Sequence, residues 1–273
     1  MQGRGFFSAL TFFQYMDTLF SLKHFICSGY YNGHRVHSPN IFHFFKYVIF
    51  PKEKFDYSLA ENTLKEYKAS KEILHTLSIG AKGDGKTIKE EKVSKIAVKS
   101  SSFGKYGRLL QRMSAYLKPK KILELGTSIG IGTIYLSSGC KDSSVITVEA
   151  SKETSEFAAK NFKKLGLNNI ECINDNFDNV LEDILTKNPD IELIFIDGNH
   201  TYAATKKYFE IIKKYASKNT IAVFDDINWS REMSKAWKEI MQSNYKSVAI
   251  EMLRMGIVFF NKDLTQKNYC TRY

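Results

Sequence analysis

From residue 121 onward, short apolar runs alternate with helical stretches, and this alternation constrains the fold of the 273-residue chain more than any other feature. The runs predict strands at residues 122–125, 145–148, 170–173, 193–196 and 221–224, each followed by a helix. Repeated strand–helix units require a parallel sheet with helices on both faces. Two last strands, 247–252 and 256–260, are separated by a short turn and predict an antiparallel hairpin at one edge. The expected fold is therefore α/β, with a mostly parallel, seven-stranded sheet.

Residues 1–95 predict a helical segment in front of this sheet. Two helical pieces reach residue 78 and are separated by a stretch that begins at Gly29 and ends at Gly33. Ser38-Pro39 marks a helix start, because Ser caps free N–H groups and Pro suits the first helical position. Residues 80–95, rich in Gly and Lys, predict an exposed linker. We therefore divide the chain into a helical N-terminal segment, 1–95, and an α/β domain, 96–273.

The first part of that segment is rich in phenylalanine. From Gly5 to Leu22 the sole charged side chain is Asp17. Polar residues interrupt the stretch too often for a membrane span, and no small-residue cleavage site of a signal peptide follows. Residues 5–27 are therefore expected to form an amphipathic helix that docks on the protein itself. Contact with a membrane surface, or with a partner subunit in a homodimer, stays open.

Charge and cysteine usage narrow the classes of function. The net charge is +11, but lysines in both parts of the chain carry most of it, which favours a solvated surface over a groove for nucleic acid. The four cysteines, Cys27, Cys140, Cys172 and Cys270, lie far apart. This spacing argues against a zinc ribbon or a disulfide scaffold and suits the reducing cytoplasm.

A glycine-rich turn follows the first strand of the α/β domain. It runs from Glu124 to Thr133 with the spacing G-x-x-x-G-x-G, which departs from the G-x-G-x-x-G fingerprint of NAD-binding proteins. Ligands of open α/β sheets bind outside the carboxyl ends of the strands, and glycine there lets the backbone approach them. Glu149 ends the second strand, where a carboxylate can accept the hydroxyls of an adenosine ribose; by itself it is equally a solvated acid.

These residues and the strand order resemble the class I S-adenosylmethionine-dependent methyltransferases, which have a Rossmann-like fold, over about residues 95–262. The resemblance implies that the glycine turn accommodates the methionine and ribose of the cofactor and that Glu149 holds the ribose hydroxyls. The adenine contact falls on Asn176 and Phe177, although Asp is usual where Asn176 stands. The implied cofactor-binding residues are Glu124, Gly126, Thr127, Ser128, Gly130, Glu149, Asn176 and Phe177, with Ser101 and Ser102 near the methionine carboxylate.

Acidic side chains follow two further strands, Asp197 after one and Asp225-Asp226 after the next. Adjacent parallel strands would bring these carboxylates together, and such a cluster needs protonation, a partner or a cation. Oxygen-rich sites of this kind suit Mg²⁺. The alternative is that Asp197 and Asp226 cap the helices that follow.

The acidic pattern is similar to that of cation-dependent O-methyltransferases. Those of the catechol and caffeoyl-coenzyme A type have Asp-Asn at the second place, whereas relatives that act on antibiotics and macrolide sugars have an acid pair there, as Asp225-Asp226 is here. The resemblance implies that Asp197, Asp225 and Asp226 bind Mg²⁺, which would lower the pKa of a hydroxyl on a small-molecule acceptor. His200 is then the candidate general base, beside Asp197. It is equally a solvent-facing histidine at a helix start.

The run from His34 to Pro39 resembles uncharacterised bacterial members of this methyltransferase group, many from Bacteroidetes. A structural loop, or a lid that contributes Arg35, is expected there rather than a metal site. Two other functions stay open: methylation of RNA or protein, suggested by the charge, and a non-catalytic module that binds cofactor or a partner. The Asn/Asp-Pro-Pro-Tyr/Phe motif of amino-group methyltransferases does not occur in the sequence.

Overall fold

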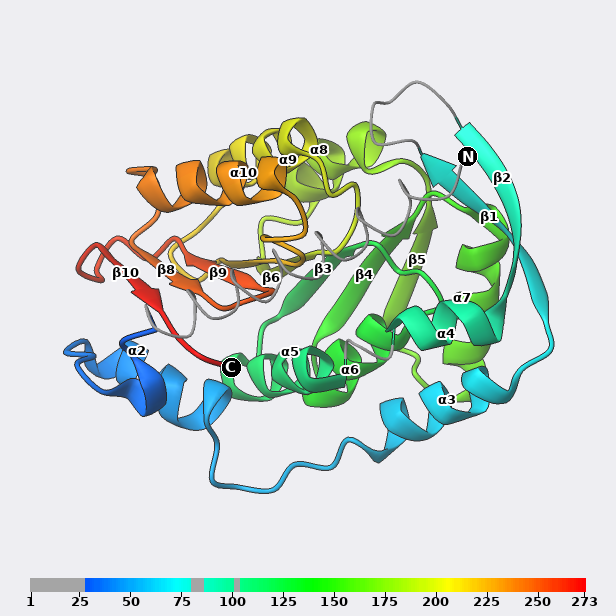
Figure 1. The fold of residues 1–273 in the computed structure, drawn as a ribbon, viewed down its shortest axis with the longest axis horizontal. Coiled ribbons are helices and arrows are strands. Elements are labelled where there is room, and N and C mark those ends of the chain that lie inside the picture. The colour runs from blue at the N-terminus through cyan, green and yellow to red at the C-terminus, as the bar shows by residue number, and fades with distance from the viewer. Residues whose placement is uncertain (1–27, 80–85, 101–103) are drawn as a thin grey trace, which may run out of the picture.

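A single mixed sheet lies between two layers of helices in the computed structural model of the chain, which describes residues 28–79, 86–100 and 104–273 (Figure 1). The strands are β3 (Lys121–Leu125), β4 (Ser144–Glu149), β5 (Ile170–Asn174), β6 (Ile191–Ile196), β7 (Ile221–Phe224), β8 (Val248–Glu251), β9 (Gly256–Phe259) and β10 (Lys267–Cys270). Their order across the sheet is β10-β8-β9-β7-β6-β3-β4-β5. Strands β3 to β7 are parallel, and β9 pairs antiparallel with both β7 and β8. The predicted α/β fold and its antiparallel hairpin are confirmed.

The sheet has one strand more than predicted. Residues 267–270 pair in parallel with β8 and form the edge strand β10. Within this strand, only Tyr269 is buried, so no apolar run marks the strand in the sequence. Its pairing with β8, from which it is separated by β9, is what makes it a strand.

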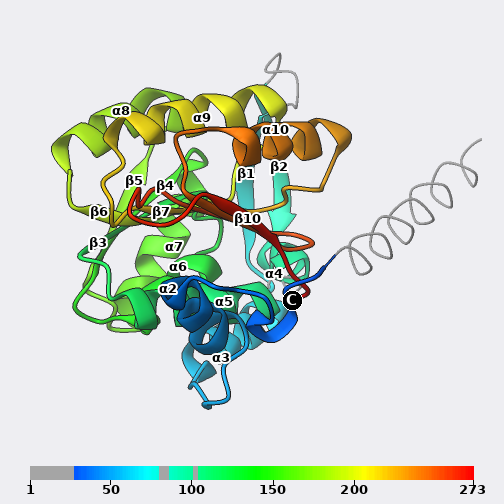
Figure 2. The ribbon, with the colours of Figure 1, turned by 90° about the vertical axis from the view of Figure 1, so that its left-hand side faces the viewer.

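Alternate residues of each strand face opposite layers, and each face has its own hydrophobic core. On β3, Ile122 packs into one core and Leu123 into the other. Figure 2 shows the sheet edge-on between the two layers. The first layer holds α5 (Gly104–Leu117), α6 (Ile131–Gly139) and α7 (Lys152–Lys164), and the second holds α8 (Phe177–Lys187), α9 (Tyr202–Tyr215) and α10 (Arg231–Gln242).

The described part of the N-terminal segment shares the core of the first layer. It contains α2 (Pro39–Phe44), which continues as η2 (Phe45–Ile49), and α3 (Ser58–Ala69). Their apolar side chains join one cluster with α5 and α6. The buried Arg112 of α5 donates to the carbonyl oxygen of Val48 over 2.6 Å and to the hydroxyl of Tyr57 over 2.9 Å. The two predicted parts of the chain are thus packed together through this face.

Residues 73–92 differ from the prediction. The expected end of the helical segment and the expected linker at 80–95 contain an antiparallel hairpin, β1 (Ile73–Ile79) with β2 (Lys86–Lys92), followed by α4 (Val93–Ser100). Over the first half of β1 the sequence reads Ile-Leu-His-Thr, which has no strict alternation of apolar and polar residues, so no strand period marks this hairpin in the sequence. Helix α4 also runs across the predicted domain boundary at 95/96.

Two other expectations concern segments near the N-terminus. His34 and His37 are both exposed beside the start of α2, in keeping with the expected loop. Residues 5–27, predicted to form a docking helix, lie outside the described residues. Among the residues described, no helix has the length and hydropathy needed to cross a membrane.

Candidate active site at the carboxyl edge of the sheet

The glycine turn after β3 depends on two glycines with left-handed backbone conformations. Gly126 has φ of 111°, and a Cβ there would lie 2.1 Å from the carbonyl oxygen of Asp197. Gly130 has φ of 87°, and a Cβ there would lie 2.6 Å from the ring of Phe162. A side chain at either position would therefore displace backbone or a buried ring.

Glu149, at the end of β4, is held by the backbone on both sides. Its Oε2 accepts from the N–H of Ser128, and its Oε1 accepts from the N–H of Ser151, each over 2.9 Å. Burial raises the pKa of this carboxyl, while these hydrogen bonds oppose the rise. Each carboxylate oxygen retains a second lone pair for another donor, such as a hydroxyl.

Glu124 supports the turn from below. It is fully buried, and its Oε2 accepts from the hydroxyls of Thr133 and Thr147 over 2.5 and 2.6 Å. Its Oε1 has no hydrogen-bond partner among the described residues. Burial raises the pKa of Glu124 to about 8, against the effect of the two hydroxyls. These bonds link β3, α6 and β4 beneath the turn.

A cavity of about 560 Å³ lies above the turn. It brings together six residues singled out in the sequence: Gly126, Thr127, Ser128, Glu149, Asp197 and Asp226. Trp229, which the sequence left open as a wall of the acceptor pocket or a core residue, also lines the cavity. Further lining residues were not indicated by the sequence: Thr76 and Leu77 of β1, Glu91 of β2, Ile96 and Lys99 of α4, and Arg254 from the β8–β9 turn. The volume is within the usual range for small-molecule sites.

The adenine contact was predicted for two further residues, Asn176 and Phe177. Asn176 caps α8, where its side chain accepts from the N–H of Asp178 over 3.0 Å. Phe177 is buried, and its ring would be 2.5 Å from a Cβ at Gly198. Neither Asn176 nor Phe177 lines the cavity, so their contact with adenine stays a prediction. Ser101 and Ser102 lie outside the described residues.

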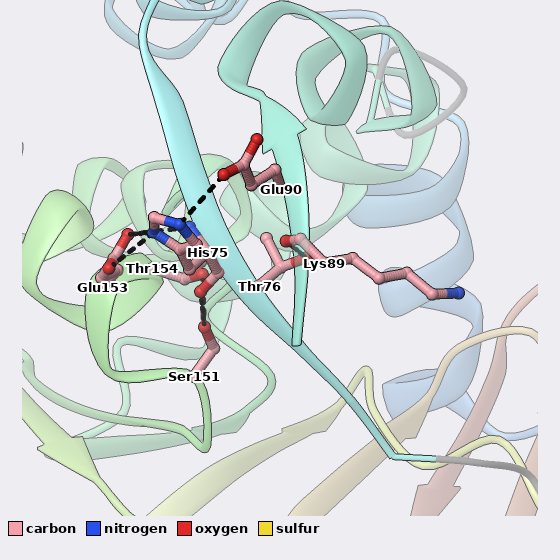
Figure 3. A network of polar contacts seen from close by, with 7 residues as sticks. All are labelled: His75, Thr76, Lys89, Glu90, Ser151, Glu153 and Thr154. Carbon is pink, nitrogen blue, oxygen red and sulfur yellow. Dashed lines mark hydrogen bonds and ion pairs between the residues drawn. The ribbon is translucent and has the colours of Figure 1, made fainter. Parts of the chain in front are cut away.

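The β1–β2 hairpin is fastened to the start of α7 by a polar network (Figure 3). The backbone N–H of His75 donates to Glu153 Oε2 over 2.7 Å, and its Nδ1 lies 2.9 Å from Glu153 Oε1. The carbonyl oxygen of His75 accepts from the hydroxyl of Ser151 over 3.3 Å. On the outer side, His75 Nε2 lies 3.4 Å from Glu90 of β2. These contacts hold the hairpin as one wall of the cavity.

The predicted acidic cluster is bound by a guanidinium group. The side chain of Asp225 is 0% exposed, and its two oxygens face Arg254: Nε lies 2.9 and 3.1 Å from them and Nη2 lies 2.6 Å from Oδ2. Arg254 Nε also lies 3.1 Å from Asp226 Oδ1. Burial opposes the charge on Arg254, but the pairing with Asp225 outweighs it and raises the pKa of the guanidinium. For Asp225, burial and the charge of Asp197 raise the pKa, and Arg254 opposes the rise.

His200 lies next to the other two carboxylates. Its Nε2 is 3.5 Å from Asp197 Oδ1 and 3.8 Å from Asp226 Oδ2. Burial disfavours protonation of the ring, but the contact with Asp197 and the surrounding carboxylates outweigh it, so the pKa of His200 is raised. His200 itself does not line the cavity, but both of its carboxylate partners, Asp197 and Asp226, do.

The predicted Mg²⁺ site does not fit this arrangement. Both oxygens of Asp225 face Arg254, which also pairs with Asp226. Within the described ranges, no group of three or more His, Cys, Asp or Glu side chains is arranged to hold a metal ion. Helix capping, the alternative for Asp197 and Asp226, is not observed either: Thr201 caps α9 and Ser230 caps α10.

Comparisons with known proteins agree with the fold and the turn. Residues 123–227 match a family model described as a methyltransferase domain. An O-methyltransferase of Aspergillus hancockii, hkm8, is 29% identical over 139 residues, which are 50% of this chain and 52% of that protein. The chain thus spans about half the length of this curated relative.

Two solved structures share the fold. The O-methyltransferase from Bacillus cereus, in complex with SAH, has a TM-score of 0.50 at 20% identity, over 78% of this chain and 93% of that one. The SAH-bound methyltransferase PaMTH1 from Podospora anserina has a TM-score of 0.52 at 16% identity, over 77% and 98%. At these identities the likeness concerns the fold alone.

Proposed function

We propose that the chain is a class I, S-adenosylmethionine-dependent methyltransferase that transfers a methyl group from this cofactor to a hydroxyl of a small molecule, as the match of residues 123–227 to a methyltransferase domain suggests. One observation carries the proposal. The glycine turn and Glu149 share a cavity with Asp197, Asp226 and Arg254, so a cofactor pocket and a polar acceptor pocket are continuous. The O-methyltransferase relative supports oxygen as the accepting atom.

The cofactor half of the cavity lies between the turn and the hairpin. Gly126 offers a surface without a side chain, and the fixed carboxylate of Glu149 can accept from ribose hydroxyls. When bound, S-adenosylmethionine supplies the methyl group on a positively charged sulfur. The hairpin residues Thr76 and Leu77 line the same cavity.

The acceptor half lies around Asp197, Asp226 and Trp229. Methyl transfer is an in-line displacement, so holding the acceptor oxygen in line with the methyl group supplies much of the rate. We assign the acceptor's hydroxyl proton to the pair formed by Asp226 and His200. The two carboxylates beside His200 stabilise its protonated ring, which makes the imidazole a stronger base.

Mg²⁺ assistance and a cytoplasmic location are further predictions from the sequence. Binding of Mg²⁺ to Asp225 would require displacement of Arg254 from this residue. The effect of EDTA on methyl transfer therefore tests whether the reaction needs Mg²⁺. The spacing of the cysteines supports the cytoplasmic location.

The proposed function is tested by calorimetric titration of the full chain with S-adenosylmethionine and, separately, with NAD, each with Mg²⁺ and again with EDTA. We expect binding of the methyl donor and none of NAD. Transfer of labelled methyl to hydroxylated acceptors then tests the reaction. Absence of binding by S-adenosylmethionine contradicts the proposal, and binding without transfer to any acceptor favours a non-catalytic module.

A further inference from the structure

We propose that Arg254 is the fixed cation of the acceptor pocket, in the position that the sequence assigned to Mg²⁺, and that it selects an acidic hydroxyl, of a phenol or an enol, as the methyl acceptor. This inference rests on the proposed function and extends it to the substrate class and to independence from metal. It follows from how Arg254 is placed, from what it pairs with, and from the cavity that it lines.

The backbone of Arg254 is tied to the loop that carries the two aspartates. Its carbonyl oxygen accepts from the N–H of Ile227 over 2.9 Å. The side-chain amide of Asn228 donates to the carbonyl oxygen of the preceding residue, Leu253, over 3.0 Å. The β8–β9 turn and the loop after β7 therefore form one unit, in which the guanidinium has a fixed position relative to Asp225 and Asp226.

The pairing with Asp225 leaves little room for a metal ion. A guanidinium presents its N–H groups as a planar fork that matches a carboxylate, and here the fork meets an aspartate whose side chain is 0% exposed. A divalent ion on Asp225 would have to displace this fork. Arg254 would then lose its buried partner while facing a second cation across the same pocket.

Arg254 also reaches the cavity. Its side chain is 24% exposed and lines the wall together with Asp226 and Trp229. A guanidinium that stays charged at every physiological pH can stabilise negative charge on an acceptor oxygen, as a donor at an oxyanion site does. Its charge is partly offset by Asp225 and Asp226, so it acts more weakly than a divalent ion.

Because the Arg254 guanidinium stabilises negative charge more weakly than a divalent ion would, it limits which hydroxyls can be methylated. A divalent ion can activate hydroxyls that ionise with difficulty, whereas a partly neutralised guanidinium suits hydroxyls that are already acidic, with a pKa near that of a phenol, about 10. Trp229, 74% exposed and in the same wall, offers an aromatic surface for a planar acceptor. A phenol or an enol meets both conditions, and a sugar hydroxyl meets neither.

The reaction balances without metal or an external oxidant. The acceptor oxygen forms the O–C bond with its lone pair as the C–S bond breaks, and that electron pair returns to sulfur. The hydroxyl proton leaves to the Asp226–His200 pair. Arg254 carries no proton in this scheme, since its part is to stabilise the oxygen as negative charge develops on it.

Metal binding is measured first, because it does not depend on activity. The full chain is titrated with Mn²⁺ alone, and free Mn²⁺ is followed by electron paramagnetic resonance. We expect no saturable site in the wild type and a new site in Arg254→Ala, where the carboxylates are released. Circular dichroism checks that the variant is folded. Saturable binding in the wild type that Asp225→Asn removes would overturn the proposal.

Methyl transfer from labelled S-adenosylmethionine is then measured with 4-nitrophenol, catechol and methyl glucoside, with EDTA and with Mg²⁺. We expect transfer to the phenols, unchanged by EDTA, and none to the glucoside. Arg254→Ala is expected to lower kcat/KM roughly 100-fold, and Arg254→Lys, which keeps the charge but not the fork, to lower it less. Cofactor affinity should be unchanged in both.

The outcomes separate this inference from the function on which it rests. Loss of transfer with EDTA, or transfer to the glucoside and not to the phenols, contradicts the role of Arg254 while leaving the methyltransferase activity intact. Failure of the wild type to bind S-adenosylmethionine by calorimetry contradicts the proposed function itself.

Discussion

The backbone N–H of Ser128 donates to Oε2 of Glu149 over 2.9 Å, and so connects the glycine turn after β3 to the end of β4. Since Ser151 donates to the other oxygen of the same carboxylate, Glu149 is fixed before any ligand arrives. A preorganised acceptor of this kind costs little entropy on binding.

We therefore expect Glu149→Gln to weaken the binding of S-adenosylmethionine by roughly 10- to 100-fold, the usual cost of a hydrogen bond to a charged group. The amide would replace one acceptor oxygen with a donor that faces a backbone N–H. Calorimetry measures the affinity, and Glu156→Gln, at an exposed glutamate of α7, is the control. Equal affinity of Glu149→Gln and the wild type would show that Glu149 does not touch the ligand.

Gly126→Ala and Gly166→Ala form a matched pair, because both glycines have positive φ, 111° and 71°. A Cβ at Gly126 meets the carbonyl oxygen of Asp197 at 2.1 Å, whereas a Cβ at Gly166 meets nothing within 4 Å. We expect Gly166→Ala to cost about 1 kcal/mol of backbone strain and to bind cofactor normally. Gly126→Ala should cost more stability and lose cofactor binding. Urea unfolding and calorimetry compare the two, and similar behaviour would contradict the clash.

Asp225→Ala is expected to lower the free energy of unfolding by about 3 kcal/mol, because it leaves Arg254 without its buried partner. The same change is expected to lower kcat/KM by no more than Arg254→Ala does, roughly 100-fold, since it acts through the position of Arg254. Asp183→Ala, which breaks an exposed ion pair with Lys187, should cost less than about 1 kcal/mol. Urea unfolding tests both. If Asp225→Ala and Arg254→Ala give additive losses in the double variant, the two residues are not coupled.

The hairpin network gives a pH dependence with a defined sign. The hydrogen bond to Glu153 raises the pKa of His75, and the backbone N–H of His75 lowers the pKa of Glu153. The contribution of His75 is complete below its unfolded-state pKa, about 6.5, and is lost as pH rises through its higher folded-state pKa. That of Glu153 is lost in strong acid, as pH falls through its lowered pKa. We expect His75→Gln to lower the Tm more at about pH 5.5 than at about pH 9. The opposite order would contradict the network.

The parts of the site that could be predicted from the sequence are those that depend on one strand and the turn after it. Gly126, Glu149 and Asp197 follow apolar strands directly, and parallel strands bring such positions to one edge. Arg254 could not be found this way, since its place depends on how the β8–β9 turn meets the loop after β7. Nothing in the sequence indicated that Asp225 and Asp226, although adjacent, would have different surroundings. Asp226 lines the cavity and has a left-handed φ of 51°, whereas Asp225 is buried.

The β1–β2 hairpin could not be anticipated as a wall of the site for a related reason. Apolar and polar residues do not alternate strictly over β1, and nothing in residues 73–92 indicates which surface they cover. That surface is set by contacts with Ser151 and Glu153, which are far along the chain.

The two sides of the cavity differ in stiffness. One side is the sheet edge, whose strands are buried on both faces. The other is a hairpin fastened through side chains that are about half exposed, His75 at 51% and Glu153 at 45%. Local opening requires least free energy where few apolar groups are buried. We therefore expect the hairpin to be the side of the cavity that opens with the least free energy, while the sheet edge keeps Glu149 and Asp197 in fixed relative positions.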